Sequence, residues 1–250
     1  MILIFDYFET IALTKVMDFN LGLKPLWEKY YKDKCTFEEI SAFGEELYVK
    51  LQEFHKKGLE YAFVKDELPE YALKYGGDVI NMTVEEEAEF LMLCNVMENM
   101  PYIPEALEEF NKMGIPMYVL SNSGFTAEAL AILLERLGIR KYFKQIWSSA
   151  DYGKVKPSRD FFEMAIEHAL SDNPAEKREN IIFVGDTYNT DVKGANDAGI
   201  DVIWINHKDE KNTDNLSVHT IRNTSELVGV VKMMMKDRKD IFNLPDEFTI

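Results

Sequence analysis

The chain has 250 residues, and 46% of them are hydrophobic, which suffices for a packed core and excludes a disordered or fibrous protein. Its formal net charge of −16 opposes binding to phosphodiester backbones and anionic lipid surfaces, so we expect no nucleic-acid partner and no membrane partner. Cys35 and Cys94 have no metal-ligand spacing, and the sequence shows no secretory signal or membrane span, so we predict a cytoplasmic protein.

A short apolar run at residues 2–5 ends in Asp6 and predicts a strand buried on both faces in the centre of a parallel sheet. Similar runs follow at 116–120, 181–184 and 202–205, with weaker ones at 145–148 and 218–221. Apolar residues at helical spacing lie between most of these runs. The alternation predicts an α/β fold with a doubly wound parallel sheet.

The stretch from residue 14 to residue 99 breaks this alternation, because it offers several helices and no convincing strand. Two capping boxes, at Thr36–Glu39 and Thr83–Glu86, predict helix starts there. We therefore predict an inserted, all-helical cap at 14–99, and a core formed by residues 1–13 and 100–250. The many aromatic side chains of the insertion are expected to pack between its helices.

Polar residues follow the predicted core strands. Asp6 ends the first strand, Ser121-Asn122-Ser123 follows the second, and Gly185-Asp186 ends the run at 181–184. Ligands bind at this edge of open parallel sheets. Each feature alone has a plain structural alternative, since Asp6 suits a turn, Ser121-Asn122 a helix cap and Asp191 an N-cap.

Together with Lys156, which precedes Pro157, these residues resemble the four motifs of the haloacid dehalogenase superfamily in order and context. The resemblance covers roughly residues 1–13 and 100–230. It implies a Rossmann-like core with a helical cap inserted after the first strand, and a hydrolase that acts on a small phosphorylated molecule.

The resemblance also implies roles for individual residues. Asp6 would attack phosphorus to give an aspartyl phosphate, while Lys156 and Ser121 stabilise charge on the transferring phosphoryl group. Asn122 and Thr10 would bind the substrate.

Magnesium is the implied cofactor. The implied ligands are the carboxylates of Asp6 and Asp186 and the backbone carbonyl of Phe8. Asp191 is implied either as a further ligand or as a hydrogen-bond acceptor that does not contact the metal directly. This set suits the preference of Mg²⁺ for one or two carboxylates together with water and phosphate oxygens.

Phe8 departs from the phosphatase pattern, which has a second aspartate at this position as general acid and base. Neither Tyr7 nor Glu9 obviously replaces it. An aromatic residue here resembles the dehalogenase branch, so 2-haloacid dehalogenation is an alternative. The chain has no arginine before Arg136 to receive a halide, however, and it keeps the Gly185-Asp186 pair that the dehalogenases lack.

A second alternative is a noncatalytic or very slow protein that binds a phosphoryl ligand and has lost turnover along with the acid at Phe8. The insertion carries no motif that names a substrate, and the sequence carries no pattern that sets an oligomeric state.

Overall fold

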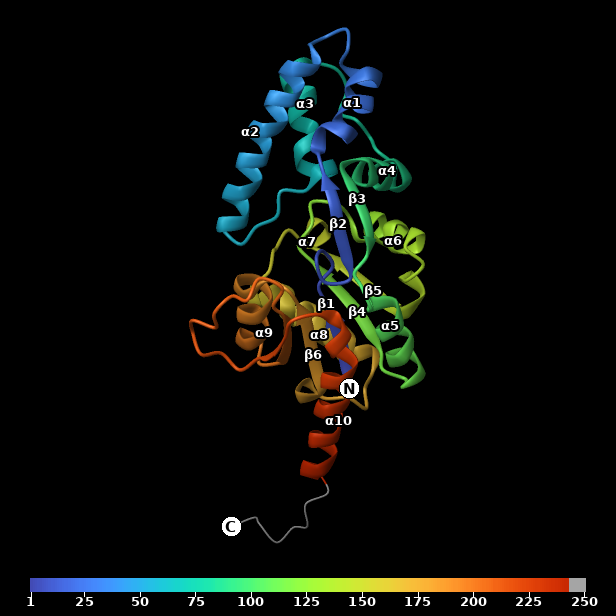
Figure 1. Cartoon of the computed structure of the whole chain (residues 1–250). Helices are drawn as coiled ribbons and strands as arrows, with labels where there is room; N and C mark the ends of the chain where they lie inside the picture. Colours follow the sequence, from blue (N-terminus) through green and yellow to red (C-terminus); the bar gives the residue numbers. More distant parts are fainter. Residues whose placement is uncertain (243–250) are drawn as a thin grey trace.

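The computed structural model describes residues 1–242, with side chains as far as Arg238. Its core is a six-stranded parallel sheet in the order β5-β4-β1-β6-β7-β8 (Figure 1). The first strand of the chain lies inside the sheet, which confirms the predicted doubly wound core. The strands are β1 (Ile2–Phe5), β4 (Met117–Ser121), β5 (Phe143–Ser148), β6 (Ile181–Gly185), β7 (Asp201–Ile205) and β8 (His219–Ile221).

Successive side chains of β1 point to opposite faces of the sheet, and both faces are covered. Leu3 and Phe5 belong to one buried apolar cluster, whereas Ile2 and Ile4 belong to another. A strand covered on both faces needs apolar residues at every position, which explains its uninterrupted run. Each such side chain stabilises the fold by about 1.5–3 kcal/mol relative to an exposed one.

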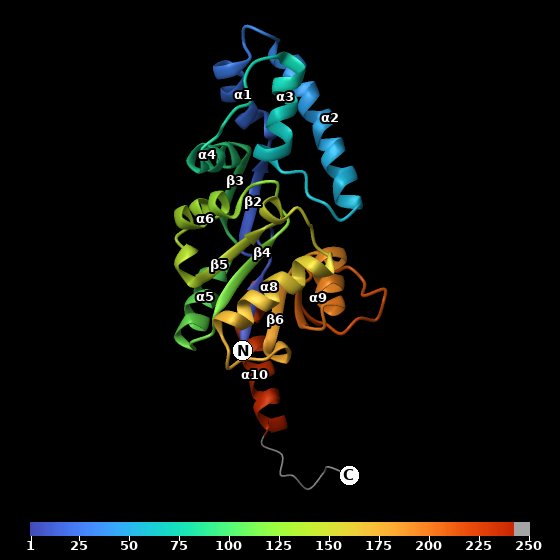
Figure 2. The same cartoon turned by 180° about the vertical axis from the view of Figure 1, so that it is seen from behind.

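Helices cover the two faces of the sheet (Figures 1 and 2). The cluster around Phe5 includes residues of α5 (Ile103–Lys112), α6 (Ala127–Arg136) and α10 (Leu227–Phe242). The cluster around Ile4 includes residues of α8 (Arg159–Asp172) and α9 (Lys193–Asp197). The short helix α7 (Ser149–Tyr152) follows β5 directly.

A group of helices lies beyond the carboxyl ends of the strands (Figures 1 and 2). It comprises α1 (Phe19–Tyr30), α2 (Phe37–Lys56), a π-helical turn at Phe63–Glu67, α3 (Leu68–Tyr75) and α4 (Val84–Cys94). Both predicted capping boxes are formed, at the starts of α2 and α4. We call this group the cap.

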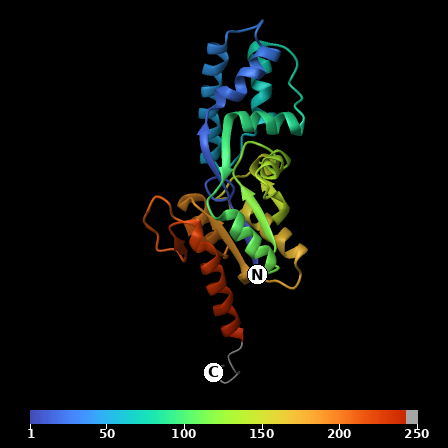
Figure 3. The ribbon, with the colours of Figure 1, turned by 45° about the vertical axis from the view of Figure 1, so that its right-hand side comes forward.

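The expectation that residues 14–99 contain no strand is wrong at both ends of the segment. Antiparallel strands β2 (Ala12–Met17) and β3 (Asn95–Asn99) form a two-stranded ribbon between the core and the cap helices (Figure 3). Both strands are short and largely exposed, so neither carries a strong apolar pattern. Their pairing joins residues about 80 positions apart, which local sequence does not reveal.

Candidate active site

The sheet register brings three predicted site residues to one edge. Phe5 lies opposite Val119 of β4 and Val184 of β6, and the Asp6 amide donates to the Val184 carbonyl at 2.8 Å. Asp6 therefore follows the centre strand, while Ser121 and Asp186 stand at the ends of the two strands beside it. This is the edge at which parallel α/β sheets bind ligands.

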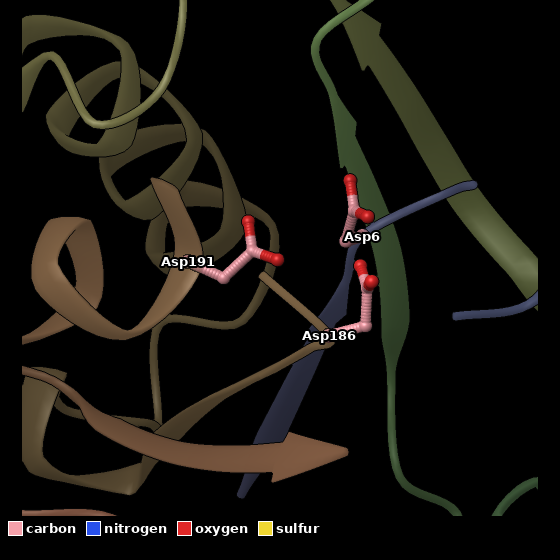
Figure 4. Close-up of side chains that lie close together, drawn as sticks. All are labelled: Asp6, Asp186 and Asp191. Carbon is pink, nitrogen blue, oxygen red and sulfur yellow. The ribbon is translucent and has the colours of Figure 1, made fainter. Parts of the chain in front are cut away.

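Three carboxylates meet at this edge. Asp6, Asp186 and Asp191 offer oxygen atoms that lie within 4.8 Å of one another, and Figure 4 shows the side chains together at the ends of β1 and β6 and in the turn after β6. Asp191 sits in a π-helical turn, Tyr188–Val192, where its Oδ2 accepts from the Thr187 amide at 3.0 Å. That bond turns the Asp191 side chain back towards the strand end.

Gly185 makes room for this arrangement. A Cβ atom at position 185 would lie 2.5 Å from Oδ2 of Asp191, closer than atoms in contact approach. A residue with a side chain would therefore displace the Asp191 carboxylate. The Gly-Asp pair seen in the sequence thus has a steric cause.

Lys156 is the cation of the cluster. Its Nζ lies 2.5 Å from Oδ1 of Asp6 and 2.8 Å from Oδ1 of Asp191, and its side chain is buried. Asn122 fixes the lysine backbone from both sides, because its Oδ1 accepts from the Lys156 amide at 2.6 Å and its Nδ2 donates to the Lys156 carbonyl at 3.0 Å. The side chain of Asn122 is thus engaged with Lys156, and its contact with a substrate stays a prediction.

Burial and repulsion between neighbouring carboxylates raise the pKa values of Asp6 and Asp186 in the cluster. Burial raises the pKa of Asp6 to about 7, with Asp191 and Asp186 adding to the effect and Lys156 opposing it. Burial also raises the pKa of Asp186 to about 6, helped by Asp191. For Lys156, burial acts to lower the pKa, but Asp191 and Asp6 raise it further than burial lowers it.

The chemistry of this donor set fits a divalent cation. When ionised, the three carboxylates carry two more negative charges than the Lys156 ammonium neutralises, and Asp6 and Asp191 are buried. Oxygen ligands of this kind are those that Mg²⁺ takes in proteins. Asp6 and Asp186 would hold the ion, with Asp191 beside them.

Three further predicted site residues are near neighbours of Asp6 or Asn122 in the sequence. Within the part of the chain that the structure describes, their side chains form no hydrogen bond to the three carboxylates. Thr10 is fully buried, and its hydroxyl has no partner within the described residues. Ser121 is also fully buried, and its hydroxyl lies 3.4 Å from the Asn122 carbonyl. Phe8 is half-buried and packs against the core cluster, and its ring is tilted by 49° to that of Tyr7 with the centroids 4.8 Å apart. Their assigned roles, including that of the Phe8 carbonyl, stay predictions.

The cap covers this site. Backbone hydrogen bonds join the two parts, from Phe63 to Gly124 at 2.8 Å, from Glu60 to Gly153 at 3.1 Å and from Val155 to Gly58 at 3.2 Å. Asp6 is only 8% exposed. No local sequence pattern marks the cap residues in these contacts, so they could not be predicted as functional residues.

Comparison with known proteins identifies the family. A family model described as haloacid dehalogenase-like hydrolase matches residues 1–199. The chain therefore belongs to the haloacid dehalogenase-like hydrolases.

Of two curated relatives, one is named as a phosphatase and the other as a 5'-nucleotidase. The chain is 31% identical over 140 residues to a glyceraldehyde 3-phosphate phosphatase of Methanocaldococcus jannaschii, a match that covers 55% of this chain and 58% of that protein. It is 26% identical over 201 residues to the pyrimidine 5'-nucleotidase YjjG of Escherichia coli, covering 80% of this chain and 75% of the relative. The chain thus spans less than two thirds of the archaeal enzyme.

Among solved structures, a 2-haloacid dehalogenase from Pseudomonas syringae matches with a TM-score of 0.64 and 20% identity, over 94% of this chain and 100% of that one. This likeness supports the fold and does not separate phosphatase from dehalogenase. Within residues 1–242, none of the helices is both long and apolar enough to cross a membrane.

Proposed function

We propose that this protein is a magnesium-dependent phosphohydrolase that acts on a small phosphorylated molecule through an aspartyl-phosphate intermediate. The observation that carries the proposal is the Asp6 carboxylate, held 2.5 Å from the Lys156 ammonium within a cluster of three aspartates. Two relatives, one named as a phosphatase and the other as a 5'-nucleotidase, support it. A small substrate suits a site that the cap covers.

The side chains of this chain suit both chemical steps. A carboxylate oxygen of Asp6 attacks phosphorus, the bond to the leaving oxygen breaks, and the leaving group takes a proton from water. Water then attacks the acyl phosphate, which releases inorganic phosphate and restores Asp6. Lys156 neutralises charge on the transferring group in both steps. Bound Mg²⁺ would supply charge neutralisation and orientation of the phosphate oxygens.

Dehalogenation of a 2-haloacid is the second candidate, and the aromatic side chain of Phe8 is the observation that favours it. Against it stands the cluster of three carboxylates, which would repel a departing halide, in a sequence that has no arginine before Arg136. The free thiols of Cys35 and Cys94 agree with the cytoplasmic location that we propose for the enzyme.

The deciding experiment measures phosphate release from 4-nitrophenyl phosphate, glyceraldehyde 3-phosphate and pyrimidine 5'-nucleotides, with Mg²⁺ and with EDTA, and halide release from 2-chloropropionate. We expect Asp6→Asn to abolish phosphate release, because an amide is no nucleophile. Asp197→Asn, at an exposed position at the end of α9, is the matched control and should keep full activity. Activity of Asp6→Asn, or full activity in EDTA, would contradict the mechanism, and halide release would favour the second candidate.

A further inference from the structure

A buried carboxylate of the cap reaches into the core beside the site. Glu60, which is 5% exposed, lies in the segment between α2 and the π-helical turn at Phe63–Glu67. Its Oε1 accepts from the Tyr61 amide at 2.9 Å and lies 2.9 Å from Nε2 of His55, both within the cap. Its Oε2 accepts from the hydroxyl of Ser149, in the core, at 2.5 Å. One carboxylate oxygen of Glu60 therefore contacts residues of the cap, and the other accepts a hydrogen bond from the core.

The core end of this link leads to the catalytic lysine. Ser149 Oγ accepts from the Ser123 amide at 2.8 Å. Ser123 directly follows Asn122, whose side chain bonds both the amide and the carbonyl of Lys156. Lys156 in turn holds Asp6. Two buried hydrogen bonds, the peptide link from Ser123 to Asn122 and the partly buried bonds of the Asn122 side chain thus join the cap carboxylate to the backbone that carries Lys156.

We propose that Glu60 is a positioning residue, which couples the seated cap to the placement of Lys156 against Asp6. The proposal rests on the function proposed above. Hydrogen bonds to an ionised carboxylate are short and strong, so Glu60 fixes the Ser149 hydroxyl while the cap is seated. When the cap moves away, the Ser149 hydroxyl keeps only the Ser123 carbonyl, 3.2 Å away, as an acceptor among the described residues. Glu60 then no longer fixes the side chain that accepts from the Ser123 amide.

Glu67 offers a matched comparison. It is also a buried glutamate of the cap, at 7% exposed, but its hydrogen-bond donor is Tyr71, within the cap itself. Replacement of Glu67 therefore perturbs the interior of the cap without removing a link to the core. Glutamine at either position keeps the size of the side chain and exchanges one acceptor oxygen for a donor.

The experiment compares Glu60→Gln, Ser149→Ala and Glu67→Gln by steady-state kinetics on 4-nitrophenyl phosphate and by amide hydrogen exchange. In Glu60→Gln, the new amide nitrogen replaces one oxygen, so either the Ser149 hydroxyl or the Tyr61 amide loses its acceptor. We expect Glu60→Gln and Ser149→Ala each to lower kcat by about 10- to 100-fold, with a smaller change in KM, because small misplacements of reacting groups cost this much. Their effects should not multiply in the double variant, since both act through one link. Glu67→Gln should retain kcat.

Amide exchange at Lys156 is the decisive probe, because its amide donates to Asn122 and neither variant changes that bond directly. We expect its exchange to accelerate in Glu60→Gln and Ser149→Ala and to stay unchanged in Glu67→Gln. This measurement needs no turnover, so it tests the link even if the wild-type protein hydrolyses no phosphate ester. Ser149→Ala, which removes a single hydroxyl, keeps the test open if Glu60→Gln does not fold. Unchanged exchange at Lys156 in the folded variants, or an equal effect of Glu67→Gln, would overturn the proposal.

Discussion

The two aspartates after β6 stand in different surroundings, although the sequence places them only five residues apart. Asp191 is fully buried, and both of its oxygens are engaged, Oδ1 with Lys156 and Oδ2 with the Thr187 amide. Asp186 is half-buried, and within residues 1–238 its one hydrogen-bond donor is the Thr187 hydroxyl, 3.2 Å from Oδ1. Asp186 is therefore the freer of the two to coordinate a cation, whereas Asp191 holds the lysine and the turn.

This difference predicts unequal effects on magnesium binding. We expect Asp186→Ala to weaken Mg²⁺ binding by more than about 100-fold. Asp191→Ala should weaken it by about 10- to 100-fold, the range typical of residues that orient the metal ligands without contacting the metal. Isothermal titration calorimetry on both variants measures this. Asp191→Ala should also lower the melting temperature more than Asp186→Ala, because it removes the acceptor of the Thr187 amide and one of the two carboxylates that pair with Lys156. Equal losses of affinity would show that the assignment of the ligands is wrong.

Phe8 decides how the site handles the leaving group. With no carboxylate at position 8, substrates with good leaving groups should be favoured, since they need little protonation. We expect Phe8→Asp to raise turnover of alkyl phosphates more than that of aryl phosphates, within the range of about 10²- to 10⁴-fold that acid-base catalysis supplies. Parallel kinetics on the two substrate classes measure the effect.

The packing of Phe8 adds a cost in stability to this substitution. Its ring contacts the core cluster and Tyr7, so loss of the ring should lower the free energy of unfolding by about 1–3 kcal/mol. Phe8→Leu is the control, because it removes the ring without adding a carboxylate and should bring no gain in rate. A folded Phe8→Asp protein with no gain on any phosphate ester would argue against phosphatase chemistry.

The site residues at the ends of strands were predictable from the sequence. The pairs of residues that meet across the interface between cap and core were not. Asp6 and Asp186 follow uninterrupted apolar runs, and parallel strands bring such ends together whatever the rest of the chain does. Glu60 and Ser149 are 89 positions apart and belong to no periodic pattern. Only the seating of the cap on the core brings them together.

At the scale of elements, the π-helical turn at Phe63–Glu67 places a carboxyl group inside the cap. Glu67 packs beside Tyr71, whose hydroxyl donates to it at 3.3 Å, a long hydrogen bond. Burial raises the pKa of Glu67 from 4.5 to about 7, although the bond from Tyr71 opposes the shift. The folded state therefore holds this proton more tightly than the unfolded chain does.

The raised pKa predicts a pH-dependent cost in stability. Below pH 4.5 Glu67 is neutral in both states, between 4.5 and about 7 only the unfolded chain releases the proton, and above 7 the penalty is complete. We expect Glu67→Gln to raise the free energy of unfolding by about 1–3 kcal/mol at pH 8.5 and to have little effect near pH 5. Thermal and urea unfolding at the two pH values measure this.

Glu70, three residues further on, gives a control of opposite sign. Its hydrogen bond from Lys50 lowers the pKa of Glu70, so its contribution to stability is present above the pKa of the unfolded state. Glu70→Gln should therefore destabilise the protein at pH 8.5. A Glu67→Gln protein that is no more stable than the wild type at pH 8.5 would contradict the burial of an ionisable group at this position.

At the scale of the whole molecule, the cap and the core meet around the site through the backbone contacts of loop 58–63. These contacts lie beside Lys156 and the loop after β4, and Asp6 itself is only 8% exposed. We therefore expect substrate entry to require that they open. The β2-β3 ribbon joins the two parts on another side (Figure 3) and keeps them connected while loop 58–63 moves. The pairs from Phe63 to Gly124 and from Val155 to Gly58 must then separate.

This arrangement predicts that a ligand in the site protects the cap loop from cleavage. Lys56 and Lys57 are exposed at the end of α2, next to Gly58, and trypsin cleaves after lysine once the local backbone opens. Mg²⁺ with orthovanadate, a phosphate analogue, should bind best when the cap is seated and so lower the population of the open form. We expect cleavage after Lys57 to slow when both are present. Cleavage after Lys177, which is exposed before β6, should keep its rate and serves as the internal control. Mass spectrometry of the fragments over time gives both rates, and an unchanged ratio between them would show that the cap does not move on ligand binding.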